Sequence, residues 1–275
     1  MHPFFGPVLG ILGHGNLTGV GEALEVQARD VPFIPMRNEQ AMVHTAVAYA
    51  WRHRRTRALA CTTSVGPGAT NLVTGAALAT INRLPVLLLP ADVFASRRVR
   101  PVLQQLERPD SQAVSVNDAL RSVSRYWDRI ERPEQLLAAL PAAMVTLTSP
   151  SATGAVTLAL PEDVQTEAFD VPTEFLEPRT WPMRRPEPSP DEVGWLAAAL
   201  AAASQPMIVA GGGVRYSAAE AELAALAEKA GIPVAETQAG KGSLPWGHPL
   251  NLGPLGVTGG SAANRYAATS DAVLC

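Results

Sequence analysis

Glu39 is a carboxylate in a position where it could handle a proton. It lies in the segment RNEQAMVH, residues 37–44, at the start of an expected helix that the side chain of Asn38 could cap. The positive end of the helix dipole stabilises a carboxylate in the first turn. Acidic residues are common at helix starts for this reason alone, so the position by itself does not distinguish a proton carrier from a favourable helix start.

Two glycine-containing turns each follow an expected strand. GHGN, residues 13–16, includes His14, a side chain suited to proton transfer near neutral pH. SVGPGATN, residues 64–71, leads into a helix, and its glycines let the backbone approach a flat ligand or an anion closely. Such turns also occur for purely geometric reasons, so either turn alone is a weak signal.

The elements around these segments predict the α/β class. Apolar strands alternate with alanine-rich helices, which is typical of a parallel sheet covered by helices. The expected strands are residues 8–12, 33–35, 57–62, 86–90 and 155–161. The expected helices are residues 21–28, 38–52, 72–82, 117–126 and 133–147. Residues 97–115 have few periodic cues and are expected to form a loop.

A proline-rich segment separates two expected domains. Residues 171–190 lack a hydrophobic period, as an extended linker does. We therefore expect a first domain over residues 1–170 and a second, incomplete α/β domain over residues 191–275, because its last strand leaves a sheet unfinished. The second domain is expected to hold helices at 191–203 and 218–230, strands at 206–213, 232–237 and 270–275, and a loop-rich stretch to Val257.

The composition is that of an ordinary soluble protein, with 47% apolar residues, 17% charged residues and a net charge of -3. This charge gives no general attraction to nucleic acid. Glycines and prolines interrupt the apolar residues 1–16 well short of the roughly 20 residues of a membrane span, so we expect a buried strand there and no membrane segment. Cys61 and Cys275 support neither a disulfide framework nor a zinc site, and a reducing cytoplasm is the default.

Taken together and in this order, the motifs resemble the thiamine-diphosphate-dependent enzymes of the acetolactate synthase type. The resemblance covers nearly the whole chain through GHGN, NEQ, SVGPGATN, VLLLPAD, LQQ and AVTLALPEDV, followed by a linker and a GGG-bearing middle domain. RNEQAMVHTA, PVLQQLE and SRYWDRIERPEQL are closer still to the trihydroxycyclohexanedione hydrolases of inositol breakdown. The resemblance implies a pyrimidine-binding domain over residues 1–170 and part of a central domain over residues 191–275.

The resemblance also implies roles for individual residues. In this family the glutamate that matches Glu39 hydrogen-bonds N1′ of the cofactor's aminopyrimidine and favours the imino tautomer, which removes the C2 proton of the thiazolium. A glutamine could not exchange that proton. His14 and Gln104 match positions that face the substrate, and Asn71 is expected to cap the next helix. The implied cofactor-binding residues are Gly13, His14, Gly15, Asn16, Glu39, Gly66, Pro67 and Gly68.

Members of the family bind magnesium and diphosphate in a later domain, through a glycine-aspartate-glycine segment followed by an asparagine. The sequence contains no such segment. The resemblance therefore implies no metal ligand in this chain and places the Mg²⁺ ligands in a further domain. Three interpretations of the chain stay open: it is a fragment, a split subunit or a mispredicted gene product. For each of them we expect the isolated chain to be inactive, and to form a homo-oligomer or to need a complementary diphosphate-binding domain.

The function that the resemblance implies is hydrolysis of a carbon–carbon bond in a small cyclic 1,2-diketone during inositol catabolism. Two alternatives stay open. An acetolactate synthase-like carboligase would use flavin as a structural cofactor, and residues 211–213 resemble the turn that contacts it. A catalytically silent binding or scaffold derivative would account for the absent diphosphate segment. The presence of Glu39, in contrast, favours a site that still performs catalysis.

Overall fold

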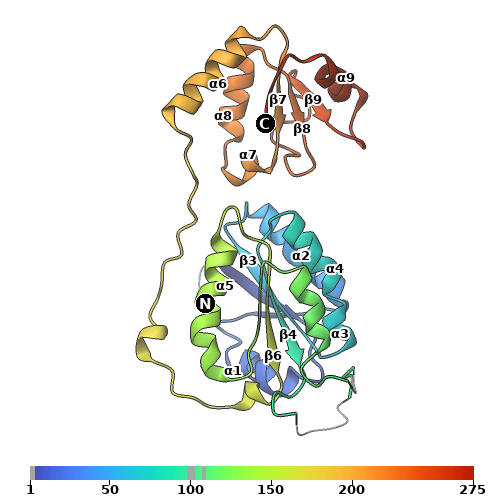
Figure 1. Ribbon diagram of the computed structural model, residues 1–275, viewed down its shortest axis with the longest axis vertical. Coiled ribbons are helices and arrows are strands. Elements are labelled where there is room, and N and C mark those ends of the chain that lie inside the picture. Colours follow the sequence, from blue (N-terminus) through green and yellow to red (C-terminus); the bar gives the residue numbers. More distant parts are fainter. Residues whose placement is uncertain (1–3, 98–102, 107–109) are drawn as a thin grey trace. The chain divides into compact units, whose positions relative to one another are not determined.

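The computed structural model describes residues 4–97, 103–106 and 110–275 and is shown in Figure 1. The chain divides into two compact units, Met1–Arg184 and Arg185–Cys275. Between η4 and α6, residues 167–189 contain one short 3-10 helix, η5 (Thr173–Phe175). No helix within the described ranges combines the length and the apolar character needed to cross a bilayer.

The first unit is built on a six-stranded parallel sheet with the order β2-β1-β3-β4-β6-β5. The strands are β1 (Phe5–Gly10), β2 (Phe33–Pro35), β3 (Ala58–Thr63), β4 (Val86–Asp92), β5 (Tyr126–Arg129) and β6 (Ala155–Pro161). The helical elements are η1 (Leu17–Gly21), α1 (Glu22–Val26), α2 (Glu39–Arg52), α3 (Pro67–Thr70), α4 (Val73–Ile81), η2 (Val116–Ser122), η3 (Pro133–Gln135), α5 (Leu136–Thr148) and η4 (Val164–Thr166).

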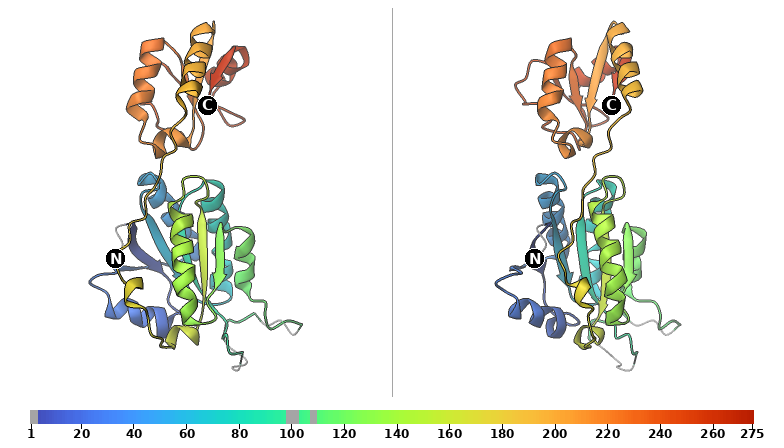
Figure 2. Two further views of the ribbon diagram at one scale, coloured as in Figure 1. Left: turned by 60° about the vertical axis from the view of Figure 1, so that its left-hand side comes forward. Right: turned by 90° about the vertical axis from the view of Figure 1, so that its left-hand side faces the viewer.

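Helices cover both faces of this sheet (Figure 2). On one face, Leu147 of α5 and Leu24 of α1 join a core with strand residues such as Val156. On the other face, α2 packs against β3 and α4. Its buried side chains recur at helical spacing, as expected for one apolar stripe, and are Met42, Val43, Ala46, Val47 and Ala50.

The strand order contains a reversal between β1 and β3. After β1 the chain moves to β2 on one side, and then returns across β1 to place β3 on the other side. The carboxyl ends of β1 and β3 therefore lie side by side while the connections leave them in opposite directions. In open α/β sheets a crevice forms at such a reversal, and ligands bind there.

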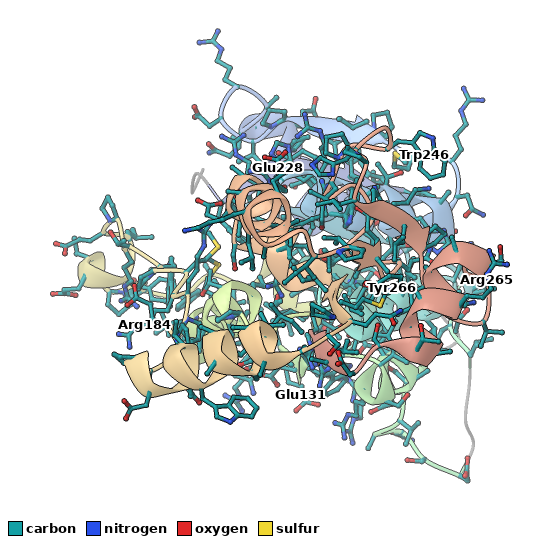
Figure 3. All side chains as sticks on the ribbon, turned by 90° about the horizontal axis from the view of Figure 1, so that it is seen from above. Glu131, Arg184, Glu228, Trp246, Arg265 and Tyr266 are labelled. Carbon is teal, nitrogen blue, oxygen red and sulfur yellow. The ribbon has the colours of Figure 1, made fainter. Side chains whose placement is uncertain are left out.

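The second unit contains a smaller parallel sheet with the order β10-β7-β8-β9. Its elements are α6 (Pro190–Ala202), β7 (Pro206–Ala210), α7 (Gly212–Tyr216), α8 (Glu220–Ala230), β8 (Val234–Glu236), β9 (Asn251–Pro254), α9 (Ser261–Thr269) and β10 (Ala272–Leu274). Leu223 of α8 packs with Ile208, whereas Tyr266 of α9 packs with the neighbouring residue Met207. The helices that carry Glu228 and Tyr266 thus cover opposite faces of the sheet (Figure 3).

Several elements match the sequence-based predictions. The strand at residues 155–161 and the capping of α2 are confirmed, since Asn38 Oδ1 accepts a hydrogen bond of 2.9 Å from the N–H of Ala41. Two predictions were wrong. Residues 117–126 do not form a continuous helix, because η2 ends at Ser122 and β5 begins at Tyr126 to pair with β6. The strand expected at residues 206–213 ends at Ala210, because Gly212 begins α7. The stretch up to Val257 is rich in turns as expected, and it also contains β9, which pairs with β8. Residues 98–102 and 107–109 of the expected 97–115 loop lie outside the described residues.

Candidate active site

A cavity of about 630 Å³ lies at the reversal between β1 and β3. Its wall combines the loop after β1, the start of α2, the turn from β3 into α3, and Gln104 from the connection after β4. The lining residues are Ile11, Leu12, Gly13, His14, Glu39, Ser64, Pro67, Gly68, Thr70, Asn71 and Gln104. The cavity therefore occupies the place where the topology predicts a ligand.

Glu39 brings a carboxylate to this wall from the first turn of α2. Its Oε2 accepts a hydrogen bond of 2.8 Å from the side-chain amide of Asn71, the residue that follows α3. The other oxygen, Oε1, faces Gly68, because a Cβ built on that glycine would lie 3.2 Å from it. One oxygen is thus fixed by the protein and the other lies beside the cavity.

Gly68 forms a narrow cradle next to this carboxylate, closely surrounded by polar groups. A Cβ at position 68 would lie 2.5 Å from Ser64 Oγ and 2.7 Å from Thr63 Oγ1, closer than real Cβ atoms approach other atoms. The hydroxyl of Thr63 is buried and has no hydrogen-bond partner among the described residues. The absence of a side chain at Gly68 thus keeps polar atoms of β3 and α2 around a common space.

Asn16 holds the loop after β1 in shape. The residue is 1% exposed, and its side-chain oxygen accepts a hydrogen bond of 2.9 Å from the N–H of Gly13. The amide of Asn16 donates to the carbonyl of Ile11 at 3.2 Å and to Thr62 Oγ1 at 3.1 Å. These bonds tie the loop to β3 and set the positions of Gly13 and His14 at the cavity.

The turn after β3 is tied to the same loop. The N–H of Val65 donates a hydrogen bond of 3.0 Å to the carbonyl of His14. Gly15 has a φ of 93°, and a Cβ there would lie 2.5 Å from Val65 Cγ1. Gly66 has a φ of 67°, and a Cβ there would overlap the carbonyl oxygen of Gln104. Both positions therefore require glycine, through backbone conformation and through close approach.

Six residues singled out from the sequence line the same cavity, namely Gly13, His14, Glu39, Pro67, Gly68 and Gln104. Gly15, Asn16 and Gly66 are buried and shape the wall from behind. Ser64, Thr70 and the apolar pair Ile11 and Leu12 were missed as lining residues, and Asn71 was expected only to cap a helix. These residues lie inside the GHGN and SVGPGATN segments or directly beside them, and this position in the sequence could have identified them as lining residues.

Two family models match the chain. Residues 7–114 match the model described as thiamine pyrophosphate enzyme, N-terminal TPP binding domain. Residues 193–275 match the model described as thiamine pyrophosphate enzyme, central domain. The chain belongs to the thiamine pyrophosphate enzymes. The cavity at the β1/β3 reversal lies within the N-terminal domain of this family, whereas residues 211–213, which follow β7 and begin α7, lie within the central domain.

About half of the aligned residues are identical between this thiamine pyrophosphate enzyme and two curated relatives. It is 50% identical over 264 residues to the 3D-(3,5/4)-trihydroxycyclohexane-1,2-dione hydrolase of Geobacillus thermodenitrificans, covering 96% of this chain and 41% of the relative. It is 47% identical over 271 residues to a protein of the same name, numbered 1, from Bacillus cereus, covering 98% of this chain and 42% of the relative. The chain spans about two fifths of the length of these relatives.

The cavity fits the aminopyrimidine of thiamine diphosphate. A flat heteroaromatic ring needs apolar walls and a few polar groups at its edge. Ile11 and Leu12 contribute apolar surface, and Glu39 contributes a carboxylate. The space beside Gly68 would be filled by any side chain at that position. No group of three or more histidine, cysteine, aspartate or glutamate side chains that could hold a metal ion occurs in the described part of the chain.

Proposed function

We propose that this chain supplies the pyrimidine-binding half of a thiamine-diphosphate-dependent hydrolase that cleaves a carbon–carbon bond in a small cyclic 1,2-diketone. The observation that carries the proposal is the carboxylate of Glu39, held by Asn71 and facing the cradle at Gly68. The names of the relatives, which are dione hydrolases about 50% identical to this chain, support the substrate class.

The residues of this chain perform the part of the reaction that concerns the pyrimidine. Glu39 would hold a proton at N1′ of the ring through Oε1, while Asn71 keeps Oε2 in place. Gly68 would leave room for the edge of the ring, and Ile11 and Leu12 would exclude water from one side of it. When bound, thiamine diphosphate supplies a carbon nucleophile at C2 that adds to a ketone.

His14 and Gln104 are the residues proposed to face the substrate. Both line the cavity, and they approach it from different connections of the sheet. In the hydrolysis, the bond between two ring carbons breaks. One of these carbons gains the hydroxyl of water and becomes the carboxylic acid of the opened chain, and the other gains the remaining hydrogen of water as a proton. We propose that His14 exchanges protons with oxygen atoms of the diketone and that Gln104 orients them by hydrogen bonding.

We propose that magnesium and diphosphate are held by a further domain, and that the enzyme works as a homo-oligomer or with a complementary diphosphate-binding partner. We propose a cytoplasmic location, which fits two free cysteines, one buried at Cys61 and one exposed at Cys275.

Replacement of Glu39 by glutamine tests the proposal. The variant keeps the size of the side chain and removes the acid, so exchange of the cofactor's C2 proton for deuterium should slow by about 100- to 10,000-fold in the chain combined with a diphosphate-binding partner. NMR follows this exchange without the true substrate. If the glutamine variant exchanges the proton as fast as the parent, Glu39 is only a helix-start carboxylate. If neither protein exchanges it faster than free thiamine diphosphate does, the chain is a silent binding derivative.

A further inference from the structure

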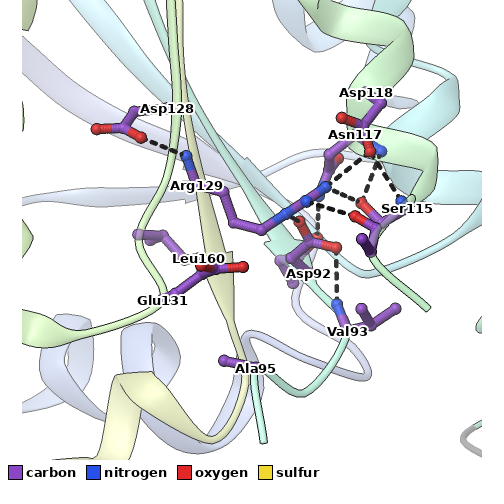
Figure 4. Close-up of polar contacts among 12 residues, drawn as sticks. Asp92, Val93, Ala95, Ser115, Asn117, Asp118, Asp128, Arg129, Glu131 and Leu160 are labelled. Carbon is purple, nitrogen blue, oxygen red and sulfur yellow. Dashed lines mark hydrogen bonds and ion pairs between the residues drawn. The ribbon is translucent and has the colours of Figure 1, made fainter. Parts of the chain in front are cut away.

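Arg129 is a partly buried cation at the end of β5, outside the cavity wall. Its side chain is 13% exposed, and its Nε pairs with Oδ2 of Asp92 at 2.7 Å. The carboxylate of Asp92 is 1% exposed. Asp92 is the last residue of β4, so the pair joins the carboxyl ends of two strands that are separated by β6 (Figure 4).

The same guanidinium reaches the beginning of η2. It donates to the carbonyl of Ala113 at 3.0 Å, to Ser115 Oγ at 2.7 Å and to Asp118 Oδ2 at 2.9 Å. Asp92 lies at the start of the connection between β4 and η2, and Ala113 and Ser115 lie at its end. A single side chain therefore holds both ends of this connection, and the planar fork of arginine can do so where a lysine ammonium cannot.

Electrostatics strengthen this arrangement. Burial alone would lower the pKa of Arg129, but the carboxylates of Asp92 and Asp118 outweigh burial and raise it above its ordinary value. The guanidinium is thus charged at every relevant pH. Asn117 adds a neutral link beside the network, since its amide donates to the carbonyl of Ala91 at 2.9 Å.

Both parts of this network lead to the cavity. The connection between β4 and η2 carries Gln104, which lines the cavity and whose carbonyl lies against Gly66. The helix η2 packs against α3, which supplies Pro67, Gly68 and Thr70 to the wall. Displacing η2 would therefore move α3, and displacing the connection would move Gln104, so the network acts on two sides of the cavity.

We propose that Arg129 is a positioning residue for the active site: by fixing Asp92 and residues 113–118 together, it holds Gln104 and α3 at the cavity. The structural half of this inference stands on the contacts alone, and its consequence for ligand binding rests on the proposed function. Arg129 touches neither cofactor nor substrate.

Three variants of the full 275-residue chain test the inference. Arg129→Lys keeps the charge but loses the simultaneous contacts with Asp92, Ala113 and Ser115. The double variant Asp92→Asn/Arg129→Met removes both charges of the pair, which avoids the cost of leaving the buried Asp92 carboxylate unpaired. Arg121→Met is the matched control, because Arg121 also pairs with Asp118 and lies over Trp127 but is 59% exposed and has no contact with Asp92 among the described residues.

Two readouts separate positioning from stability. The first is the nuclear Overhauser effect between Hα of Gly66 and the protons of Gln104, which reports their close approach. It should disappear in Arg129→Lys and in the double variant, and persist in Arg121→Met. The second is the dissociation constant for thiamine, which should rise about tenfold in the first two variants, the equivalent of one lost hydrogen bond. Thermal unfolding checks that the variants are folded.

Persistence of the Gly66–Gln104 signal in Arg129→Lys and in the double variant overturns the inference. Loss of the signal in Arg121→Met as well also overturns the inference. A general weakening of the structure around Asp118 would then be enough to explain the loss of the signal. If the signal follows the predicted pattern but the parent chain binds no thiamine, the positioning role stands and the proposed function fails. The two proposals are therefore tested separately.

Discussion

The side-chain amide of Asn71 donates a hydrogen bond of 2.8 Å to Oε2 of Glu39, although 32 positions separate the two residues in the sequence. Asn71 follows the short helix α3, and Glu39 begins α2. The bond leaves Oε1 as the oxygen that faces Gly68. Asn71 is thereby a partner of the candidate catalytic carboxylate and more than a residue at a helix end.

Replacing Asn71 by alanine should weaken thiamine binding about tenfold, because a hydrogen bond to a charged group is lost and the carboxylate can rotate. Titration followed by NMR measures the dissociation constant. Asn82→Ala is the matched control, since Asn82 bonds only the carbonyl of Leu78 at the end of α4, at 2.9 Å, among the described residues. Equal affinity of the two variants would show that the Asn71 bond does not orient Glu39.

Replacing Gly68 by alanine should lower thiamine affinity more than tenfold, because the new Cβ would lie 2.5 Å from Ser64 Oγ and occupy the cradle. Gly213→Ala is the control, since a Cβ at Gly213 meets nothing within 4 Å and alanine is favoured over glycine in a helix. Calorimetric titration compares the two. Unchanged affinity in Gly68→Ala would place the ring elsewhere in the cavity.

Replacing Asn16 by alanine should lower the free energy of unfolding of the first unit by about 1–3 kcal/mol, because the N–H of Gly13 and the carbonyl of Ile11 lose a buried partner. Urea titration measures the change. Asn264→Ala should lower the free energy of unfolding of the second unit by less than this. The two hydrogen bonds of Asn264 with the backbone of Gly256 are exposed, so water can replace them. A larger loss for Asn264 than for Asn16 would contradict the role of the buried amide.

Asp163 should make the stability of the first unit depend on pH. Burial alone would raise the pKa of Asp163, but hydrogen bonds from the N–H groups of Ser96, Ala95 and Val164 outweigh it and lower the pKa below the ordinary value of 3.8. The carboxylate therefore contributes its full stabilisation above pH 3.8 and loses it as the pH falls through the lowered folded-state value.

Asp163→Asn tests this dependence. At neutral pH the variant should melt below the parent, and the difference should shrink as the pH is lowered beneath 3.8. Thermal unfolding followed by circular dichroism between neutral and strongly acidic pH measures it. A difference that stays constant over the whole range would show that the ionised form of Asp163 makes no special contribution.

The sequence by itself determined the features that depend on neighbouring residues. The apolar run of β6, the cap of α2 by Asn38 and the helix-start position of Glu39 are local, because hydrophobic period and capping act within a few residues. The α/β class followed from the alternation of such elements. The motif order also singled out Glu39, His14 and Gly68, which line one cavity.

Only the tertiary structure decided which distant residues meet. The short strands β5 and β9 have weak local signals, and they form because a neighbouring strand supplies their hydrogen bonds. The pairing of Asn71 with Glu39, and of Arg129 with Asp92, depends on the strand order that brings their elements together. Side-chain contacts across a sheet are set by its topology, which a local pattern does not encode.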